Sequence, residues 1–247
     1  YGIILLYKDN NSKNEIVLKI EQNEIITEKE IGKFISNHPE CNTIRVRYLK
    51  SYSADGNNSW DPVRYNLYIL DKLNGDLNHL IKTYNTKGTY NEWFTNVVEE
   101  VRKQISCLYK GNYYYTDLKL GNILYCDSKG DISIHLGDLG SVKPDTKNDY
   151  MATHPPIEYK KSNGFFKIAT KKNAKQILTW LLGIIGLCIV DLKFCYKKLT
   201  FNTINDTPHS EIMDIINNST KINQTNKTIL QKLLIEDPEQ RIKEINI

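Results

Sequence analysis

The first part of the chain is built from short apolar runs separated by polar turns, a pattern typical of β-strands. The runs predicted to be strands are Tyr1–Tyr7, Glu15–Ile20, Thr43–Leu49 and Tyr65–Leu70. A short polar turn separates the first two runs, which therefore predict a hairpin. A longer polar loop is expected over Ser51–Pro62. A single helix is expected in this part, over Thr27–Asn37, because His38-Pro39 ends it and Thr27 is a candidate N-cap.

The pattern then changes to a helical period. Leu77–Thr83 and Asn91–Leu108 are predicted to be helices. The second has an apolar stripe at Phe94, Val97, Val98, Val101, Ile105 and Leu108, and we expect it to be a core helix that carries no chemistry. A later apolar run, Ile177–Leu192, is shorter than the ~20 residues that span a bilayer. It contains two glycines, so it predicts a buried helix rather than a membrane segment.

Between these helices lies a stretch that predicts a β-hairpin. Two strand-like runs, Ile123–Cys126 and Ile132–Leu136, are joined by a polar turn over residues 127–130. Asp117 lies in a glycine-containing loop before the first run, and Asp138 lies in another loop after the second. Because a hairpin brings its two outer ends together, we expect both loops to meet at one edge.

The residues expected at this edge suit a divalent cation and a polyphosphate. They are two carboxylates, one amide and one ammonium group, from Asp117, Asp138, Asn122 and Lys119. Oxygen ligands suit Mg²⁺, which proteins bind through one or two carboxylates together with substrate phosphates.

Composition restricts the possible classes of protein without naming one. The chain has 247 residues, of which 40% are hydrophobic and 25% charged, as is ordinary for a globular protein. The net charge of +4 comes without any block of like charge, so nucleic-acid binding has no support. Five scattered cysteines with no C-x-x-C pair favour a reduced, intracellular and cytoplasmic protein. We expect no membrane partner.

The motifs of the hairpin resemble those of eukaryotic-type protein kinases. Asp117–Asn122, which reads D-L-K-L-G-N, resembles the catalytic loop D-L-K-x-x-N, and Asp138–Gly140 resembles D-F-G. Other motifs follow the family's order. They are Glu15–Ile20 for V-A-I-K, Thr153–Glu158 for the A-P-E segment, Trp180–Gly183 for W-S-L-G and Leu233–Arg241 for L-x-x-D-P-x-x-R. The resemblance extends from Gly2 to Arg241.

This resemblance implies an α+β, bilobal kinase-like fold. Residues 1–72 would form a small, β-rich N-lobe, and residues 73–247 a larger, mostly helical C-lobe. Gly2 would be the tail of the glycine-rich nucleotide loop, so the chain is expected to begin inside that loop.

The resemblance also implies roles for the hairpin residues. Asp117 would accept or orient the proton of the substrate hydroxyl, and Lys119 would offset charge on the transferred phosphate. Asn122 and Asp138 would hold Mg²⁺. Lys119 also marks the loop version that is directed at serine and threonine.

The remaining nucleotide contacts would come from the N-lobe and the hinge. Lys19 would grip the α- and β-phosphates of ATP, and Glu30 would pair with Lys19, with Glu28 as a competing partner. Asp71 and Leu73 lie in the segment that resembles the hinge, where backbone groups bind adenine.

Two sites depart from the family's pattern, and the resemblance implies one further ion pair. Tyr115-Thr116 stands where the family has His-Arg, so we expect activity that does not need a phosphate on the activation loop. Leu178 replaces an aspartate that supports the catalytic loop. Glu158 and Arg241 would form a buried ion pair.

The sequence therefore predicts an ATP- and Mg²⁺-dependent serine/threonine kinase acting on a protein substrate. Two alternatives stay open: a pseudokinase that binds a nucleotide or a partner, and a small-molecule kinase of the aminoglycoside or choline kinase type. The sequence predicts no oligomeric state.

Overall fold

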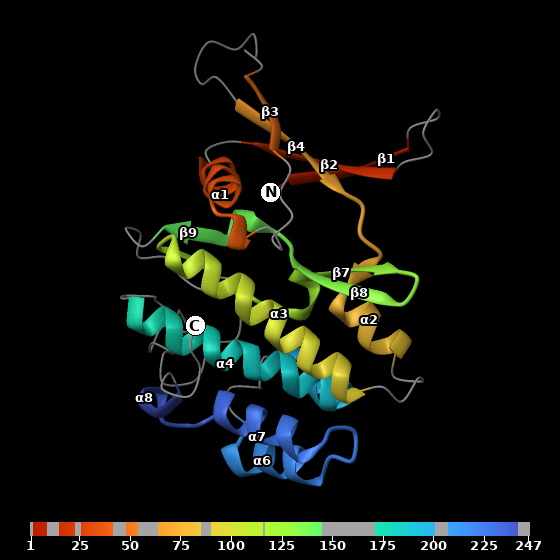
Figure 1. Ribbon diagram of the computed structural model, residues 1–247, viewed down its shortest axis with the longest axis vertical. Helices are drawn as coiled ribbons and strands as arrows, with labels where there is room; N and C mark the ends of the chain where they lie inside the picture. Colours follow the sequence, from red (N-terminus) through yellow and green to blue (C-terminus); the bar gives the residue numbers. More distant parts are fainter. Residues whose placement is uncertain are drawn as a thin grey trace. The chain divides into compact units, whose positions relative to one another are not determined.

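The computed structural model describes residues 2–8, 15–22, 26–41, 48–53, 64–84, 90–115, 117–144, 171–200 and 207–241. It divides into two compact units, Tyr1–Asn74 and Gly75–Ile247. The boundary lies two residues after the one expected from the sequence. Each unit is considered separately below (Figure 1).

A four-stranded antiparallel sheet forms the first unit, in the order β1-β2-β4-β3. Its strands are β1 (Gly2–Lys8), β2 (Glu15–Gln22), β3 (Tyr48–Ser53) and β4 (Arg64–Asp71). The predicted hairpin of the first two strands is confirmed. Strand β2 lies between β1 and β4, so its side chains have neighbours on both sides.

The third strand differs from the prediction at its end. Residues 51–53 were expected to begin a loop, but Ser51 pairs with Asn66 and Ser53 with Arg64. Pairing with β4 thus holds a polar segment in the sheet that its composition alone does not favour. The predicted start of this strand, residues 43–47, lies outside the described residues.

Helix α1 (Ile26–Asn37) confirms the predicted helix and is followed by the short 3-10 helix η1 (Pro39–Cys41). Ile31 and Ile35 lie one turn apart and are buried. Thr27, the expected N-cap, lies inside the helix, which begins one residue earlier.

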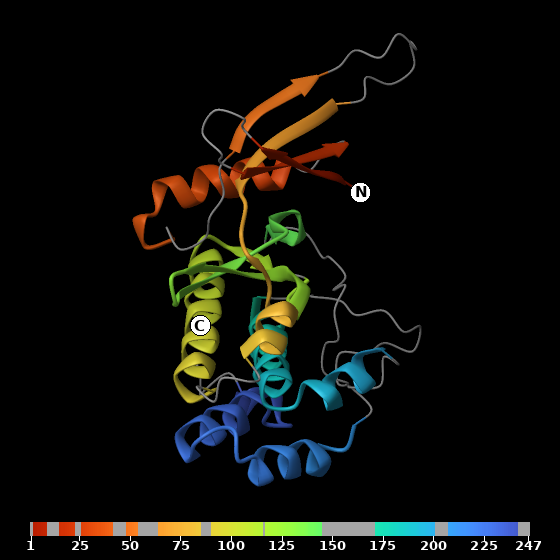
Figure 2. The same cartoon turned by 90° about the vertical axis from the view of Figure 1, so that its right-hand side faces the viewer.

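Helices dominate the second unit. They are α2 (Leu77–Tyr84), α3 (Tyr90–Lys110), α4 (Lys171–Val190), α5 (Leu192–Thr200), α6 (His209–Asn218), α7 (Gln224–Leu233) and α8 (Pro238–Arg241). Figure 2 shows α3 and α4 near each other, with the blue α6 and α7 below them, as in Figure 1.

The buried helix expected in this unit is α4. Its segment Asn173–Val190 is long and apolar enough to cross a membrane, but 89% of that segment is buried inside the protein. Two glycines on it allow close helix packing. A Cβ atom on Gly183 would lie 2.6 Å from Leu234 of the loop after α7, and one on Gly186 would lie 2.5 Å from Leu230 of α7. Larger residues would push these segments apart.

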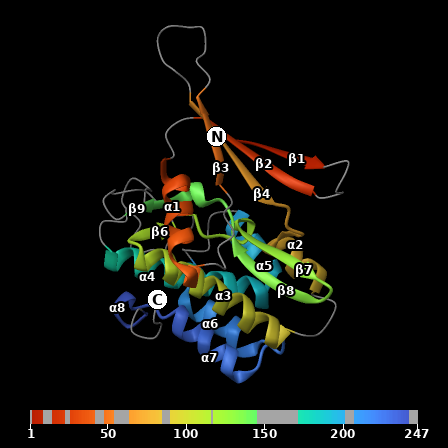
Figure 3. The ribbon, with the colours of Figure 1, turned by 45° about the horizontal axis from the view of Figure 1, so that its top comes forward.

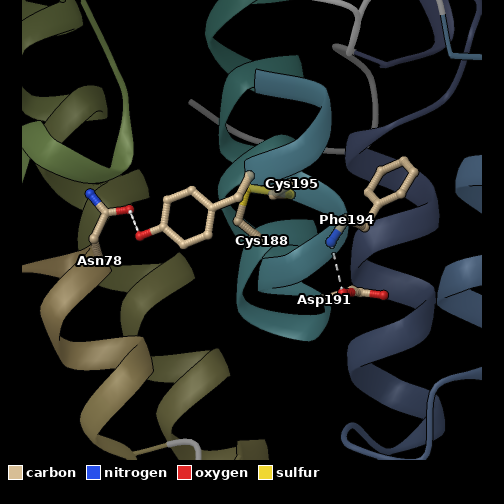
Figure 4. The surroundings of a disulfide bond; sticks show 6 residues. Asn78, Cys188, Asp191, Phe194 and Cys195 are labelled. Atoms are coloured by element: carbon tan, nitrogen blue, oxygen red, sulfur yellow. Dashed lines mark hydrogen bonds between the residues drawn. A yellow bond between two sulfur atoms is a disulfide. The ribbon is translucent and has the colours of Figure 1, made fainter. Parts of the chain in front are cut away.

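The apolar run does not form one helix to Leu192, because the chain turns at Asp191. The carboxylate of Asp191 accepts a hydrogen bond of 3.0 Å from the backbone N–H of Phe194, in the first turn of α5. This corner brings Cys188 and Cys195 together as a disulfide, with Cα atoms 5.3 Å apart (Figure 4). The expectation of reduced cysteines throughout is therefore wrong for this pair.

The predicted catalytic hairpin is confirmed as β7 (Ile123–Ser128) and β8 (Asp131–Leu136). With β5 (Gly75–Asp76) they form a sheet in the order β5-β7-β8. The turn is shorter than the four residues expected, because only Lys129 and Gly130 lie between the strands. Both have positive φ, 58° and 97°, as a two-residue hairpin turn requires.

Candidate active site

Two short strands hold the loop that precedes the hairpin. Strand β6 (Tyr113–Tyr115) pairs with β9 (Val142–Pro144), which follows the Asp138 loop. Leu118 and Leu120 are buried and anchor the loop between β6 and β7, whereas the intervening Lys119 is exposed. The sequence did not predict this pairing of β6 and β9, which closes the two functional loops against each other.

Asp117 is the buried centre of this loop, with 6% of its surface exposed. Its Oδ2 atom accepts hydrogen bonds from Lys119 Nζ at 2.6 Å and from Asn122 Nδ2 at 2.9 Å. The amide of Asn122 also donates to the backbone carbonyl of Asp117 at 2.8 Å. Three of the predicted site residues are thus brought together, and charge-assisted bonds fix the carboxylate.

The second oxygen of the same carboxylate is different. Asp117 Oδ1 is buried and has no hydrogen-bond partner in the described part of the chain. An unsatisfied buried acceptor of this kind costs ~1–3 kcal/mol, so it calls for a functional explanation. The capacity of this oxygen to accept a hydrogen bond is therefore unused among the described residues.

The hairpin joins Asn122 to the loop of Asp138. Ile123 pairs with Leu136, and the next backbone N–H, of Gly137, donates to the carbonyl of Asn122 at 2.7 Å. The hydroxyl of Tyr115 donates to the carbonyl of Gly137. The predicted meeting of the two loops therefore occurs, and Tyr115, which stands where the family has histidine, supports it.

Gly137 lies where a side chain would press against Leu124. A Cβ atom there would lie 2.9 Å from Cδ1 of Leu124 and 3.4 Å from the carbonyl oxygen of Asn122. The lack of a side chain therefore allows the close approach that places Asp138 beside Asn122.

Asp138 has a left-handed backbone, with φ 46° and ψ 59°, and an exposed side chain. It precedes the 3-10 helix η3 (Leu139–Ser141), and its Oδ2 accepts a 3.2 Å hydrogen bond from Ser141 Oγ. A non-glycine residue in this conformation is uncommon and is frequent at functional sites.

The donor atoms at this edge fit a hard cation. Because Nδ2 of Asn122 donates to Asp117, its Oδ1 atom is the oxygen left for a ligand. Together with the carboxylate of Asp138 it would offer oxygen ligands of the kind that Mg²⁺ takes in proteins.

Lys19 belongs to the first unit, where it lies in β2 opposite Ile4 and Tyr68. It is only 9% exposed. Burial of an ammonium group is costly unless a partner or ligand compensates it.

Glu30 does not pair with Lys19 in the structure. Glu30 is exposed on α1, and no ion pair or hydrogen bond joins it to Lys19 among the described residues. The physical reason is the orientation of the helix, because burial of Ile31 and Ile35 turns Glu30 outward. The side chain of Glu28 lies outside the described set.

The other nucleotide residues expected in the first unit lie at strand ends. Gly2 begins β1 and pairs with Glu21, and Asp71 ends β4 and pairs with Ile16. Leu73 follows and is half-buried.

Between Asp71 and Leu73, Lys72 forms an ion pair with Glu15, and its hydrogen bond and charge lower the pKa of the Glu15 carboxyl. Both side chains are well exposed, so this pair adds little stability.

The remaining residues singled out in the sequence are Thr116, Leu178, Glu158 and Arg241. Thr116 and Glu158 lie outside the described residues. Leu178 is buried in α4. Arg241 is fully buried, as expected, and its guanidinium donates to the backbone carbonyls of Ile235 at 2.8 Å and Glu236 at 3.1 Å.

Comparison with known families agrees with this geometry. The family model described as protein kinase domain matches residues 2–246 of the chain. No curated protein matches the chain.

Proposed function

Because this chain belongs to the protein kinase family, we propose that it is an active kinase that transfers the γ-phosphate of ATP to serine or threonine hydroxyls of a protein. Phosphoryl transfer depends on positioning and on charge stabilisation more than on covalent chemistry. The residues around Asp117 supply both.

The unpartnered Oδ1 atom of Asp117 is the observation that carries this proposal. A substrate hydroxyl donating to that oxygen would satisfy a buried acceptor and would be oriented for attack on the γ-phosphate. Lys119 and Asn122 hold the other oxygen of the carboxylate.

Lys119 supports both catalysis and the choice of hydroxyl. Its side chain is about half-exposed, and its Nζ atom lies 2.6 Å from the carboxylate of Asp117. In this proposal it would offset negative charge on the transferred phosphate. A lysine at this place in the loop is typical of family members that act on serine and threonine.

Asn122 and Asp138 would hold Mg²⁺, and Lys19 would bind phosphates of ATP. The metal, when bound, neutralises charge on the phosphates. Asn122 has a second task, because its amide group also orients Asp117.

We further propose that the protein acts inside the cell, in the cytoplasm, on protein partners.

A transfer assay with several acceptors tests the proposal. The chain is incubated with γ-labelled ATP, Mg²⁺ and, in separate reactions, generic proteins, an aminoglycoside and choline. We expect label on protein, and acid hydrolysis should yield phosphoserine and phosphothreonine. Label only on a small molecule would overturn the choice of substrate class. Nucleotide binding without any transfer would identify a pseudokinase.

A further inference from the structure

Strand β8 ends two residues before Asp138, and one of its edges has no neighbouring strand in the described part of the chain. The sheet order β5-β7-β8 leaves β8 paired with β7 alone. In an antiparallel pair, every second residue directs its backbone groups away from the partner strand. For Ile132, Ile134 and Leu136 these outward groups need partners from elsewhere, because unpaired buried backbone groups are costly.

Helix α3 supplies those partners with side-chain amides. Figure 3 shows α3 running alongside β8. Gln104 Nε2 donates to the carbonyl of Ile134 at 2.7 Å, and the N–H of Leu136 donates to Gln104 Oε1 at 2.8 Å. Nearer the hairpin turn, Asn96 Nδ2 donates to the carbonyl of Ile132 at 3.2 Å.

The amide of Gln104 thus makes the two hydrogen bonds that the backbone of a neighbouring strand would otherwise make. It offers one donor and one acceptor to two residues of the same edge, which no apolar side chain of similar size can do. Gln104 is fully buried, and Val101, Ile105 and Leu108 of the same helix are also buried. This core helix thus also holds the edge of β8 through one polar side chain.

The two hydrogen bonds of Gln104 lie just before the loop that contains Asp138, the proposed metal ligand. Leu136 precedes Gly137, whose backbone bonds to Asn122 and to the Tyr115 hydroxyl. Asp138 then adopts its left-handed backbone. An uncommon conformation persists only where the surrounding structure determines it, and the end of β8 is the anchor on the side that precedes Asp138.

We propose that Gln104 is a positioning residue for the Asp138 carboxylate. It holds the end of β8 through Ile134 and Leu136, and so sets the backbone from which Asp138 reaches a divalent cation. The inference rests on the proposed function for its metal readout. Its structural part, the order of residues 137–141, is independent of any activity.

Gln104→Met tests this, because methionine has similar length but makes neither hydrogen bond. Asn96→Ala is the matched control, since it removes an exposed amide from the same strand edge, farther from Asp138. Amide hydrogen exchange is measured on the folded protein and is read from the proteolytic peptide that covers residues 137–141. We expect faster exchange in Gln104→Met and wild-type exchange in Asn96→Ala. Equal exchange in the two variants would overturn the proposal.

The metal readout is the Mg²⁺ concentration that gives half-maximal nucleotide binding. Loss of a residue that orients a metal ligand typically weakens metal affinity ~10–100-fold. We expect a rise of at least about tenfold for Gln104→Met, with binding restored at high Mg²⁺, and no rise for Asn96→Ala. An unchanged Mg²⁺ requirement in Gln104→Met would contradict the proposal. Absence of nucleotide binding by the wild-type protein would contradict the proposed function, while the exchange measurement would still decide the role of Gln104.

A second variant covers the case in which Gln104→Met does not fold. In Gln104→Glu, burial favours the neutral carboxyl, which can donate to Ile134 and accept from Leu136. We expect wild-type exchange at residues 137–141 in this variant. Faster exchange there in a folded Gln104→Glu protein would count against the proposal.

Discussion

Asp117 and Asp138 are both acidic residues beside glycine-containing loops, yet their surroundings suit different tasks. Asp117 is 6% exposed, and two side chains hold one of its oxygens. Asp138 is exposed and stands on an uncommon backbone conformation. A buried, fixed oxygen suits a single proton donor, whereas an exposed carboxylate can take a partly hydrated cation.

Replacement of Asp138 should remove Mg²⁺-dependent nucleotide binding. Asp138→Ala deletes the one carboxylate that we assign to the cation, so the rise in melting temperature caused by ATP with Mg²⁺ should disappear. Asp131→Ala is the control, because Asp131 is an exposed aspartate at the turn end of the same hairpin. If Asp138→Ala kept the full thermal shift, its role as a metal ligand would be rejected.

Gly137→Ala should destabilise the protein by ~1 kcal/mol, because the added Cβ would press against Leu124, whose side chain must shift to relieve the contact. Urea denaturation measures the difference. Gly121→Ala is the control, since a Cβ there would lie 3.9 Å from its nearest neighbours, Asp76 and Asn78. The control should change stability by less than ~0.5 kcal/mol. Equal effects of the two variants would show that position 137 tolerates a side chain.

At the scale of elements, the catalytic hairpin was predictable because its signals are local. Two strand-like runs and a turn with Gly130 predicted β7 and β8, and their pairing placed Asn122 beside the Asp138 loop. The pairing of β6 with β9 was missed because it joins short segments that are distant in sequence. Gln104 was missed because a single amide in an apolar stripe does not change the helical period.

The corner between α4 and α5 shows a similar limit. Hydrophobicity continues through Leu192, so the pattern predicted one helix, whereas the N-cap at Asp191 begins a new one. Beyond the disulfide, Tyr196 of α5 donates to Asn78 of α2 at 3.2 Å (Figure 4). The corner therefore also orients a contact between α5 and α2.

Loss of the Cys188–Cys195 bond should lower stability. The bond closes a loop with a sequence separation of 7, and the entropy of such a loop predicts a loss of ~2–3 kcal/mol on opening. Cys195→Ala and the control Cys126→Ala, which changes a free thiol, are compared by urea denaturation under oxidising conditions. Equal stability of the two variants would mean that the bond is not formed in solution. In a reducing cytoplasm the pair is expected to be open.

At the scale of the whole molecule, family motifs spread along the chain specify a fold that no single segment could predict. The match over residues 2–246 agrees with their order. In the second unit, the glycines of α4 let Leu230 and Leu234 approach closely, and Arg241 binds the carbonyls of Ile235 and Glu236. The sequence predicted the burial of Arg241 but not these carbonyl partners. Every residue has a backbone carbonyl, so the residue types do not show which one accepts a hydrogen bond.

Arg241→Ala should cost ~3–5 kcal/mol of stability, because it removes a buried charged donor and leaves its acceptors unsatisfied. Arg102→Ala is the control, since Arg102 is partly exposed and its ion pair with Glu99 should contribute less than ~1 kcal/mol. Thermal and urea unfolding measure both.

The predicted pair of Arg241 with Glu158 is tested by a double-mutant cycle, in which the two alanine changes together should cost less than the sum of the singles. Strict additivity would reject that pair.

The most direct measurement for the proposed kinase activity compares wild-type protein with Asp117→Asn in the same assay. Nucleotide binding and phosphoryl transfer from labelled ATP are measured together, with Asp131→Asn as a control for the chemical change. We expect Asp117→Asn to bind ATP with Mg²⁺ as the wild type does and to transfer phosphate ~10²–10⁴-fold more slowly, the usual effect of losing a positioned base. Transfer at the wild-type rate by folded Asp117→Asn protein would contradict the central role of this carboxylate.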